Sequence, residues 1–201
     1  DLSDDLILAM KECDKVCKHM HLPLQSGSSR ILKIMNRHYD KEQYLEIVRK
    51  LREAIPDIAL TTDIIVGFPG ETEEDFMETM DVVKQVEYDS AFTFIYSKRT
   101  GTPAASMENQ CDPDEVKRHF DMLLKEVQLI STRKAMELEG KVVEVLAEEP
   151  NEQDASLITG RLANNAVVHF PGDVGMIGKL YQVKLTECKG FYYLGEVVAN
   201  E

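Results

Sequence analysis

Hydrophobic positions in the first two thirds of the chain alternate between two spacings. Some stretches repeat every three to four residues, which is typical of amphipathic helices, and others are short continuous apolar runs, which are typical of buried strands. Strands separated by helices predict right-handed βαβ units and a parallel sheet. The expected strands cover residues 16–25, 58–68 and 91–97, and the longer expected helices carry their apolar stripes over residues 44–55, 76–86 and 116–130.

Helix-start signals precede each helical stretch. Asp40 and Gln43 form a capping-box pair, and Thr72 stands ahead of three consecutive acids that favour a helix N-terminus. Ser28 or Ser29 can cap a short helix, and Pro113 suits the first turn of a long one. We therefore expect an α/β fold of about three βα units, half of a (β/α) barrel, over residues 1–137.

The helical spacing ends after Leu138. Short runs rich in valine, leucine and tyrosine follow, separated by glycine-containing turns. This pattern predicts a small closed antiparallel β-barrel similar to the oligonucleotide-binding fold, with a domain boundary near residues 137–140 and a second domain over residues 138–201. The expected strands cover residues 141–149, 156–163, 166–170, 179–189 and 191–198.

Composition and charge narrow the functional classes. The chain has 201 residues, of which 43% are hydrophobic and 29% charged, so it can bury a core. No apolar run reaches the roughly 20 residues of a membrane span, and the first residues do not resemble a signal peptide. Four scattered cysteines fit a reducing cytoplasm, where we expect the protein. The net charge of -13 excludes binding to nucleic acid through a diffuse positive field.

Small polar residues and glycine follow each expected strand of the parallel sheet. The segments are QSGS after the first strand, GFPGE after the second and SKRTGT after the third. Ligands bind at the carboxyl ends of parallel strands, so we expect Gln25, Gly67 and Ser97 to meet at the edge of one cavity. Taken alone, GFPG is also compatible with a tight connection between a strand and a helix.

Three long motifs carry a family resemblance. HMHLPLQSGSSRILKIMNRHY, TTDIIVGFPGETEEDF and FTFIYSKRTGTPAA, in this order and followed by a small β domain, resemble the radical-SAM methylthiotransferases. The resemblance is strongest to the enzymes that convert isopentenyladenosine beside the tRNA anticodon into its 2-methylthio derivative. It implies that the α/β part is the later half of a radical-SAM barrel and that the β part is a TRAM domain.

The resemblance also implies a cofactor site for S-adenosylmethionine. Ile65, Val66 and Gly67 would lie against the adenine, and Gln25 and Ser26 would reach the ribose or the amino-acid end. A buried Asp63 would need hydrogen-bond donors, for which Arg99 and Thr62 are candidates. The expected cofactor-binding residues are Gln25, Ser26, Thr62, Asp63, Ile65, Val66, Gly67, Ser97 and Arg99.

In the β domain, the segment GRLANNAVVHF resembles an RNA-facing turn. Arg161 would contact phosphate or stack on a base, and Asn164 and Asn165 would read base edges, with the anticodon stem-loop of tRNA as partner. Residues 138–201 contain five Lys and Arg against ten Asp and Glu. The alternative is therefore a packing module in which the two asparagines form a hairpin turn.

The residues for the redox chemistry are missing. The resemblance implies two [4Fe–4S] clusters, one of them held by a C-x3-C-x2-C motif. Cys13 and Cys17 have the first spacing, but the third position is Met20. We therefore assign no catalytic residue and no metal ligand to this chain. The N-terminal domain and the first half of the barrel would lie outside it, and we expect it to be inactive alone and to expose apolar surface where that half would pack.

Other functions stay open at this point. One is a methylthiotransferase that acts on threonylcarbamoyl-adenosine in tRNA, and another is the related enzyme group that modifies an aspartate of a ribosomal protein. A third is a non-catalytic RNA-binding module with the same two domains. An upstream cluster motif would support an enzyme, and its absence would support the module.

Overall fold

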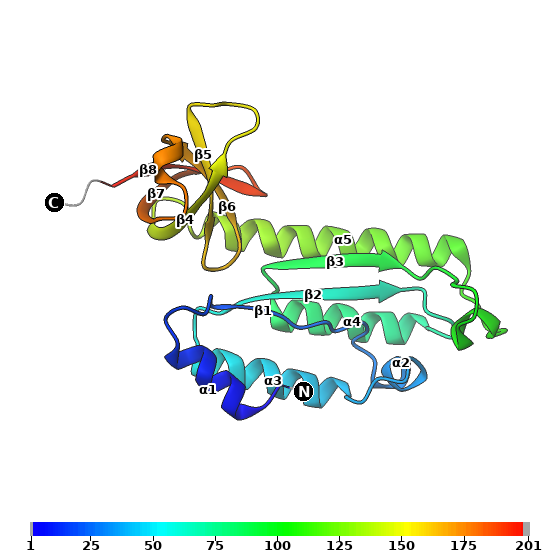
Figure 1. Cartoon of the computed structure of the whole chain (residues 1–201). Helices are drawn as coiled ribbons and strands as arrows, with labels where there is room; N and C mark the ends of the chain where they lie inside the picture. Colours follow the sequence, from blue (N-terminus) through cyan, green and yellow to red (C-terminus); the bar gives the residue numbers. More distant parts are fainter. Residues whose placement is uncertain (1, 199–201) are drawn as a thin grey trace. The chain divides into compact units, whose positions relative to one another are not determined.

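The computed structural model describes residues 2–198 and divides the chain into two compact units (Figure 1). Of the described residues, the first unit comprises those up to 12 and residues 20–131, and the second comprises residues 13–19 and 132–198. Among residues 2–198, no helix combines the length and apolar character needed to cross a membrane.

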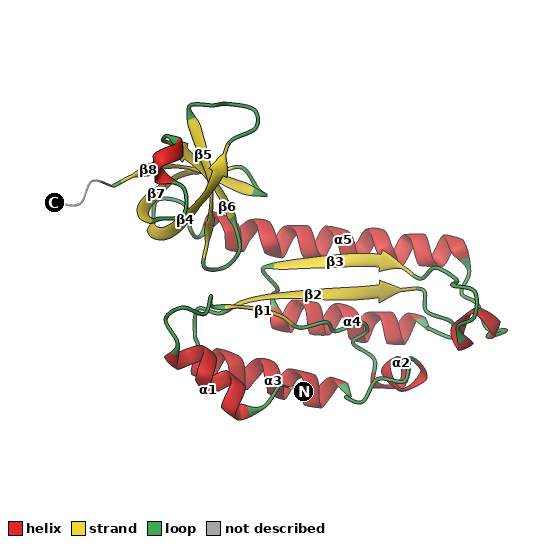
Figure 2. Cartoon of the chain, in the orientation of Figure 1, coloured by secondary structure: helices red, strands yellow, loops and turns green. Residues whose placement is uncertain are grey.

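The first unit is built on a three-stranded sheet in the order β1-β2-β3 (Figure 2). Strands β2 and β3 pair in parallel, with Asp63 opposite Phe92, which confirms the predicted parallel sheet. The strands are β1 (His19–His21), β2 (Ala59–Val66) and β3 (Ser90–Ile95).

Strand β1 is shorter than the predicted run of residues 16–25. After Leu22 the backbone leaves the ladder, because Pro23 has no N–H group and the N–H of Leu24 donates to the hydroxyl of Thr62 at 2.8 Å. Backbone pairing returns only as a single parallel bridge between Gln25 and Ile64. The first predicted strand is therefore a short strand followed by an extended segment.

The helices begin largely where the capping signals predict. Asp40 and Gln43 form the expected capping box, and Thr72 forms another with Asp75. Helix α1 has no counterpart among the predicted elements. The α-helices are α1 (Asp4–Glu12), α2 (Ser29–Ile34), α3 (Lys41–Ala54), α4 (Glu73–Val86) and α5 (Pro113–Met136), and short 3-10 helices occur at η1 (Pro103–Ser106) and η2 (Val174–Met176).

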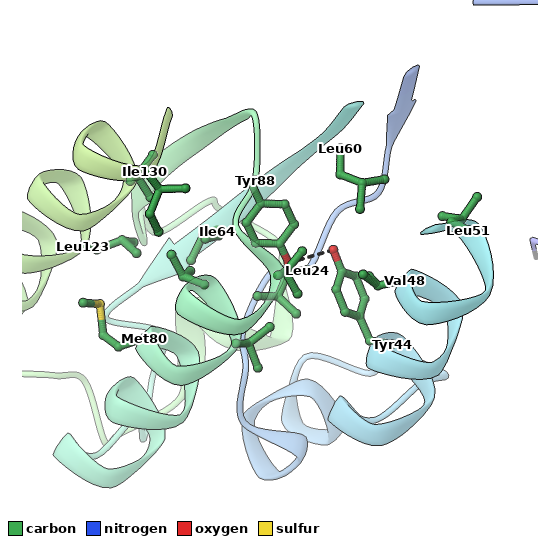
Figure 3. Close-up of a cluster of buried hydrophobic side chains, with 14 of the residues drawn as sticks. Leu24, Tyr44, Val48, Leu51, Leu60, Ile64, Met80, Tyr88, Leu123 and Ile130 are labelled. Carbon is green, nitrogen blue, oxygen red and sulfur yellow. Dashed lines mark hydrogen bonds between the residues drawn. The ribbon is translucent and has the colours of Figure 1, made fainter. Parts of the chain in front are cut away.

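One face of the sheet packs against helices α3, α4 and α5. Leu60, Ile64 and Val66, which share this face of β2, are at most 1% exposed and belong to the same core as residues of all three helices. The core includes a polar contact, since the hydroxyls of Tyr88 and Tyr44 lie 2.9 Å apart (Figure 3). Burial raises the pKa of Tyr44 to about 12, so both phenols stay neutral.

The other face of the sheet is more open. Thr61, Asp63 and Ile65 alternate with the buried residues of β2 and are half-buried. Phe92 and Phe94, beside them on β3, are 57% and 50% exposed. The unit therefore presents apolar surface on this face of β3.

The second unit is a closed barrel in the strand order β4-β5-β6-β8-β7. The pairings are antiparallel, as predicted, except that β6 and β8 run parallel. Inward-facing Val145, Ile158, Phe170 and Val183 are at most 1% exposed and fill the interior. The strands are β4 (Val142–Pro150), β5 (Leu157–Leu162), β6 (Val167–Pro171), β7 (Leu180–Cys188) and β8 (Tyr192–Val197).

Candidate functional site

A cavity of about 490 Å³ lies where the strand ends of the first unit meet. Five of the predicted cofactor residues line it: Gln25, Asp63, Ile65, Ser97 and Arg99. The remaining wall consists of Arg37, Phe68, Phe94, Ile95, Tyr96, Thr102 and Ala104. Segments that follow all three strands thus contribute to one cavity of the size that small-molecule ligands occupy.

The other four predicted residues lie outside the lining of this cavity. Ser26 is fully buried, and its hydroxyl accepts a hydrogen bond from the N–H of Ser28 at 3.2 Å. The Thr62 hydroxyl donates to the carbonyl of Leu22 at 2.8 Å, and Val66 lies in the core. Thr62 and Val66 point toward the helices because side chains alternate along a strand.

Gly67 shapes the wall without lining it. Its φ angle is +76°, and its N–H donates to the Glu71 carboxylate at 2.6 Å. A Cβ atom at this position would lie 2.6 Å from a Val116 methyl group, so glycine is required here for both conformation and space. The turn between β2 and α4 therefore places Phe68 in the cavity wall.

Asp63 has a different partner from those expected. Its carboxylate is 30% exposed and lies 3.4 Å from the Nε2 atom of His21, whose Nδ1 atom lies 3.0 Å from the Thr61 hydroxyl. Thr62 points to the opposite face of the sheet, and Arg99 lines the same cavity but no contact between it and the Asp63 carboxylate is found within residues 2–198. His21 lies on the neighbouring strand β1. The sequence alone does not tell how β1 and β2 are aligned, so it could not predict this contact.

Tyr96 is a site residue that the sequence reasoning missed. It directly follows β3 and precedes Ser97, its ring meets that of Phe68 edge-on with centroids 5.3 Å apart, and it lines the cavity. Its hydroxyl is buried and has no hydrogen-bond partner among the residues that the structure describes. A buried hydroxyl without a partner is costly, which indicates a ligand that supplies one. The rule that placed Ser97 at a strand end could also have found Tyr96.

The cavity fits S-adenosylmethionine by its chemistry. Phe68 and Phe94 offer apolar contact for an adenine, and Tyr96 offers an unused hydroxyl. Asp63 suits an ammonium group, and the Arg37 guanidinium suits a carboxylate. The residues present could thus hold each part of this cofactor.

A hydrogen-bonded cluster, which we call the Asp75 clasp, joins the two loops beside the cavity. The buried Asp75 carboxylate accepts hydrogen bonds from the Ser28 hydroxyl at 2.6 Å, from Arg30 and from the Thr72 N–H at 2.8 Å. Arg30 also donates to the carbonyl of Gly70 at 2.6 Å. The clasp therefore fixes the loop after β1 to the loop after β2.

Glu71 carries an unusual carboxyl group in the second of these loops. Burial raises the pKa of Glu71 to about 7, although the hydrogen bond from the Gly67 N–H opposes the shift. Since an unfolded glutamate has a pKa of about 4.3, the folded protein binds a proton that the unfolded chain releases between these pH values. The contribution of Glu71 to stability therefore falls as the pH rises from about 4.3 to about 7.

Replacing Glu71 by glutamine should remove this part of the pH dependence, because the amide stays neutral at every pH. Scanning calorimetry at about pH 5.5 and about pH 8 measures how far the thermal midpoint falls between these two pH values. The fall should be smaller in the variant than in the wild type. Glu74→Gln, at an exposed position in the first turn of helix α4, serves as the control and should keep the wild-type difference. An unchanged difference in Glu71→Gln would contradict the assignment.

The cysteines do not form a metal site in the described residues. Cys13 and Cys17 are exposed, Cys111 and Cys188 are half-buried, and all four are free. Within residues 2–198, no group of three or more cysteine, histidine, aspartate or glutamate side chains is positioned to hold a metal ion. The described residues thus do not fit an iron–sulfur cluster.

In the second unit, the predicted RNA-facing residues contact one another. Arg161 pairs with Glu148 at 3.0 Å and donates to the carbonyl and side-chain oxygens of Asn165 at 3.3 Å. Asn164 accepts from the N–H of Ala166 at 3.0 Å, and Asn165 has a φ angle of +70°. The two asparagines form the hairpin turn between β5 and β6, and Arg161 remains 38% exposed.

Comparisons with known proteins match two separate segments of the chain to two protein families. Residues 1–83 match the Radical SAM superfamily and residues 137–198 match the TRAM domain. The tRNA-2-methylthio-N(6)-dimethylallyladenosine synthase of Lachnoclostridium phytofermentans is 58% identical over 200 residues, which cover 100% of this chain and 44% of the relative. The enzyme of the same name from Thermoanaerobacter sp. is 56% identical over 198 residues, covering 98% of this chain and 42% of the relative.

A solved structure supports the fold. Coproporphyrinogen III oxidase from Escherichia coli, described as a radical SAM enzyme, superposes with a TM-score of 0.50 at 16% identity, covering 100% of this chain and 50% of the other. The chain spans less than half the length of the two synthases above. The chain thus contains one segment that matches the Radical SAM superfamily and another that matches the TRAM domain, and over 98–100% of its length it is similar to part of these two synthases.

Proposed function

We propose that this chain is the cofactor-binding and RNA-facing part of a cytoplasmic enzyme that adds a 2-methylthio group to isopentenyladenosine, also called dimethylallyladenosine, in tRNA. The observation that carries the proposal is the buried, unpartnered Tyr96 hydroxyl in a cavity lined by the strand ends. The synthases that match over 98–100% of the chain carry this activity in their names. The substrate region is the anticodon stem-loop, and the domain boundary lies near residues 137–140.

The cavity residues would divide the work of holding the cofactor. S-adenosylmethionine, when bound to a reduced cluster, supplies the radical for the reaction. Asp63 would hold the ammonium group, Arg37 and Arg99 would hold the carboxylate, and Gln25 and Ser97 would donate to ribose oxygens. Phe68 and Phe94 would exclude water from the reacting atoms.

The two [4Fe–4S] clusters would come from parts of the enzyme outside this chain. The described residues provide no ligand set for either cluster. The chain alone should therefore bind the cofactor weakly and transfer no methylthio group. The missing half of the barrel would cover the exposed face that carries Phe92 and Phe94.

The alternatives receive less support. Enzymes acting on threonylcarbamoyl-adenosine or on a ribosomal-protein aspartate could share the fold, but the relatives at 54–58% identity are named as dimethylallyladenosine synthases. A non-catalytic RNA-binding module would have no need for a cavity that leaves a buried hydroxyl unpaired.

Replacing Tyr96 by phenylalanine in the full-length enzyme tests the cofactor site. The variant should bind S-adenosylmethionine about fivefold to tenfold more weakly, as expected for the loss of one hydrogen bond, while its thermal midpoint stays unchanged. Calorimetric titration measures the affinity, and mass spectrometry of tRNA nucleosides measures the 2-methylthio product.

Tyr39→Phe is the matched control. Its hydroxyl already donates to the carbonyls of Pro23 and Leu24 at 3.1 Å, so its loss should lower the free energy of unfolding by about 1 kcal/mol. Unchanged affinity of Tyr96→Phe for the cofactor would overturn the assignment of this cavity. Absence of the 2-methylthio product with the wild-type enzyme would overturn the proposed activity.

A further inference from the structure

The outer face of strands β5, β6 and β8 collects side chains suited to one unpaired nucleobase. Side chains alternate along each strand, so that Ile158, Val168 and Tyr193 point inward and their neighbours point outward. In the ladder, Arg161 lies opposite Val167, which lies opposite Tyr192. The next outward row contains Thr159, His169 and Leu194. We call these two rows the β5-β6-β8 face.

His169 is held in one orientation on this face. The Oδ1 atom of Asn151 accepts from the N–H groups of Gln153 and Asp154 at 2.9 and 3.0 Å, which fixes the amide. The Nδ2 group of Asn151 must then donate to Nδ1 of His169 at 3.0 Å. Burial lowers the pKa of His169, so the ring is neutral and its proton lies on Nε2. Within residues 2–198 this Nε2–H group has no recorded acceptor, and it is available to a ligand.

Tyr192 provides an aromatic surface beside this donor. Its ring centroid lies 4.9 Å from that of His169, and the residue is 36% exposed. Arg161 lies two strands away in the same row, a backbone separation of about 10 Å. A ring for stacking, a fixed N–H donor and a guanidinium for phosphate therefore occur within the span of neighbouring nucleotides.

The charge of the domain favours this kind of recognition. With ten acids against five bases in residues 138–201, RNA cannot be held there by a diffuse field. Stacking works without net charge, and aromatic side chains stack on unpaired bases in single-stranded RNA. A duplex would hide its bases from Tyr192.

We propose that the β5-β6-β8 face binds one unpaired base of an RNA loop, which stacks on Tyr192 and accepts a hydrogen bond from Nε2 of His169, while Arg161 contacts a neighbouring phosphate. This assignment rests on the proposed function, since it takes the RNA to be the tRNA substrate. It extends that function by naming the residues that recognise an unpaired base. Arg161 would exchange part of its contact with Glu148 for the phosphate.

The test uses the full-length enzyme and a synthetic tRNA anticodon stem-loop labelled with a fluorophore. Tyr192→Leu should weaken stem-loop binding about tenfold, the effect expected from the loss of one stacked base. Tyr192→Phe keeps the ring and should stay within about twofold of the wild type. His169→Gln should lose about threefold to tenfold, as expected for one hydrogen bond. Val142→Ala, at an exposed position of β4, is the control and should bind like the wild type.

The outcomes separate this inference from the proposed function. If the wild-type enzyme does not bind the stem-loop, both fail. If it binds, and Tyr192→Leu and His169→Gln bind equally well with unchanged thermal midpoints, only the inference is overturned. Should Tyr192→Leu fail to fold, wild-type affinity in His169→Gln would still overturn it. Equal loss of affinity for a fully paired duplex of the same length would point to phosphate contacts instead and would also overturn it.

Discussion

Asp75→Ala should lower the free energy of unfolding by about 3 kcal/mol, because it leaves several donors without their acceptor. The Asp75 carboxylate is 4% exposed and accepts from Ser28, Arg30 and Thr72. Its loss removes the Asp75 half of the capping box at the start of α4 and the link between the two loops beside the cavity. Urea unfolding at neutral pH measures the change.

The pH dependence gives a second measure of the same group. Burial opposes ionisation of Asp75, but hydrogen bonds from Arg30, Ser28 and Thr72 outweigh it and hold its pKa well below its usual range. The stabilisation is therefore fully present above the unfolded pKa of about 3.9 and is lost as the pH falls toward the folded value. Asp75→Asn keeps the shape of the side chain but not its charge, so its free energy of unfolding should fall less than that of the wild type as the pH is lowered.

Glu78→Gln is the control. Glu78 forms a surface ion pair with Lys41, so its replacement should change the free energy of unfolding by less than about 1 kcal/mol. A urea-unfolding midpoint in Asp75→Ala equal to that of the wild type would contradict the stabilising role of the clasp.

Gly27→Ala should be about as damaging, with an expected cost of about 3 kcal/mol, the upper end for overpacking. A Cβ atom at Gly27 would lie 2.4 Å from the Cα atom of Thr79 and 2.7 Å from the carbonyl oxygen of Glu78. Both are backbone atoms of helix α4, which cannot move aside as a side chain would. The loop would have to lift away from α4 and would carry Gln25 with it, so cofactor affinity should fall together with stability.

Gly101→Ala separates steric overlap from backbone strain. Gly101 has a φ angle of +86°, but a Cβ atom there would meet nothing within 4 Å. Its substitution should cost only about 1 kcal/mol, the strain of the left-handed conformation. If urea unfolding showed that Gly27→Ala lowers the free energy of unfolding no more than Gly101→Ala does, the close packing of this loop on α4 would not contribute to stability.

Local signals made most of the fold predictable. The capping boxes at Asp40 and Thr72 depend on residues three positions apart, so sequence alone places these helix starts. The length of β1 was not predictable in this way. The N–H group of Leu24 donates to the side-chain hydroxyl of Thr62 instead of a backbone carbonyl, and these two residues are 38 positions apart in the sequence. The parallel β6–β8 pair likewise depends on how the barrel closes, which no short segment records.

The candidate site was predictable where it followed strand ends and not where it depended on register. Gln25 and Ser97 follow their strands and line the cavity. Thr62 and Val66 were included although alternation with Asp63 and Ile65 places them on the opposite face. The contact between His21 and Asp63 needs the register of two strands, which only the folded sheet provides.

The position of β8 between β6 and β7 makes the barrel depend on its last strand. Without β8, the other four strands still form a ladder, in which β4 pairs with β5 and β7, and β5 pairs with β6. In that ladder β6 and β7 each have one unpaired edge until residues 192–197 insert between them. During synthesis, the ribosome has to release these residues before the ladder can close. A nascent chain arrested before Tyr192 would expose two strand edges with unpaired backbone N–H and C=O groups, and such edges can pair with strands of other chains. Premature termination in this segment would therefore yield an aggregation-prone product rather than a slightly shortened domain.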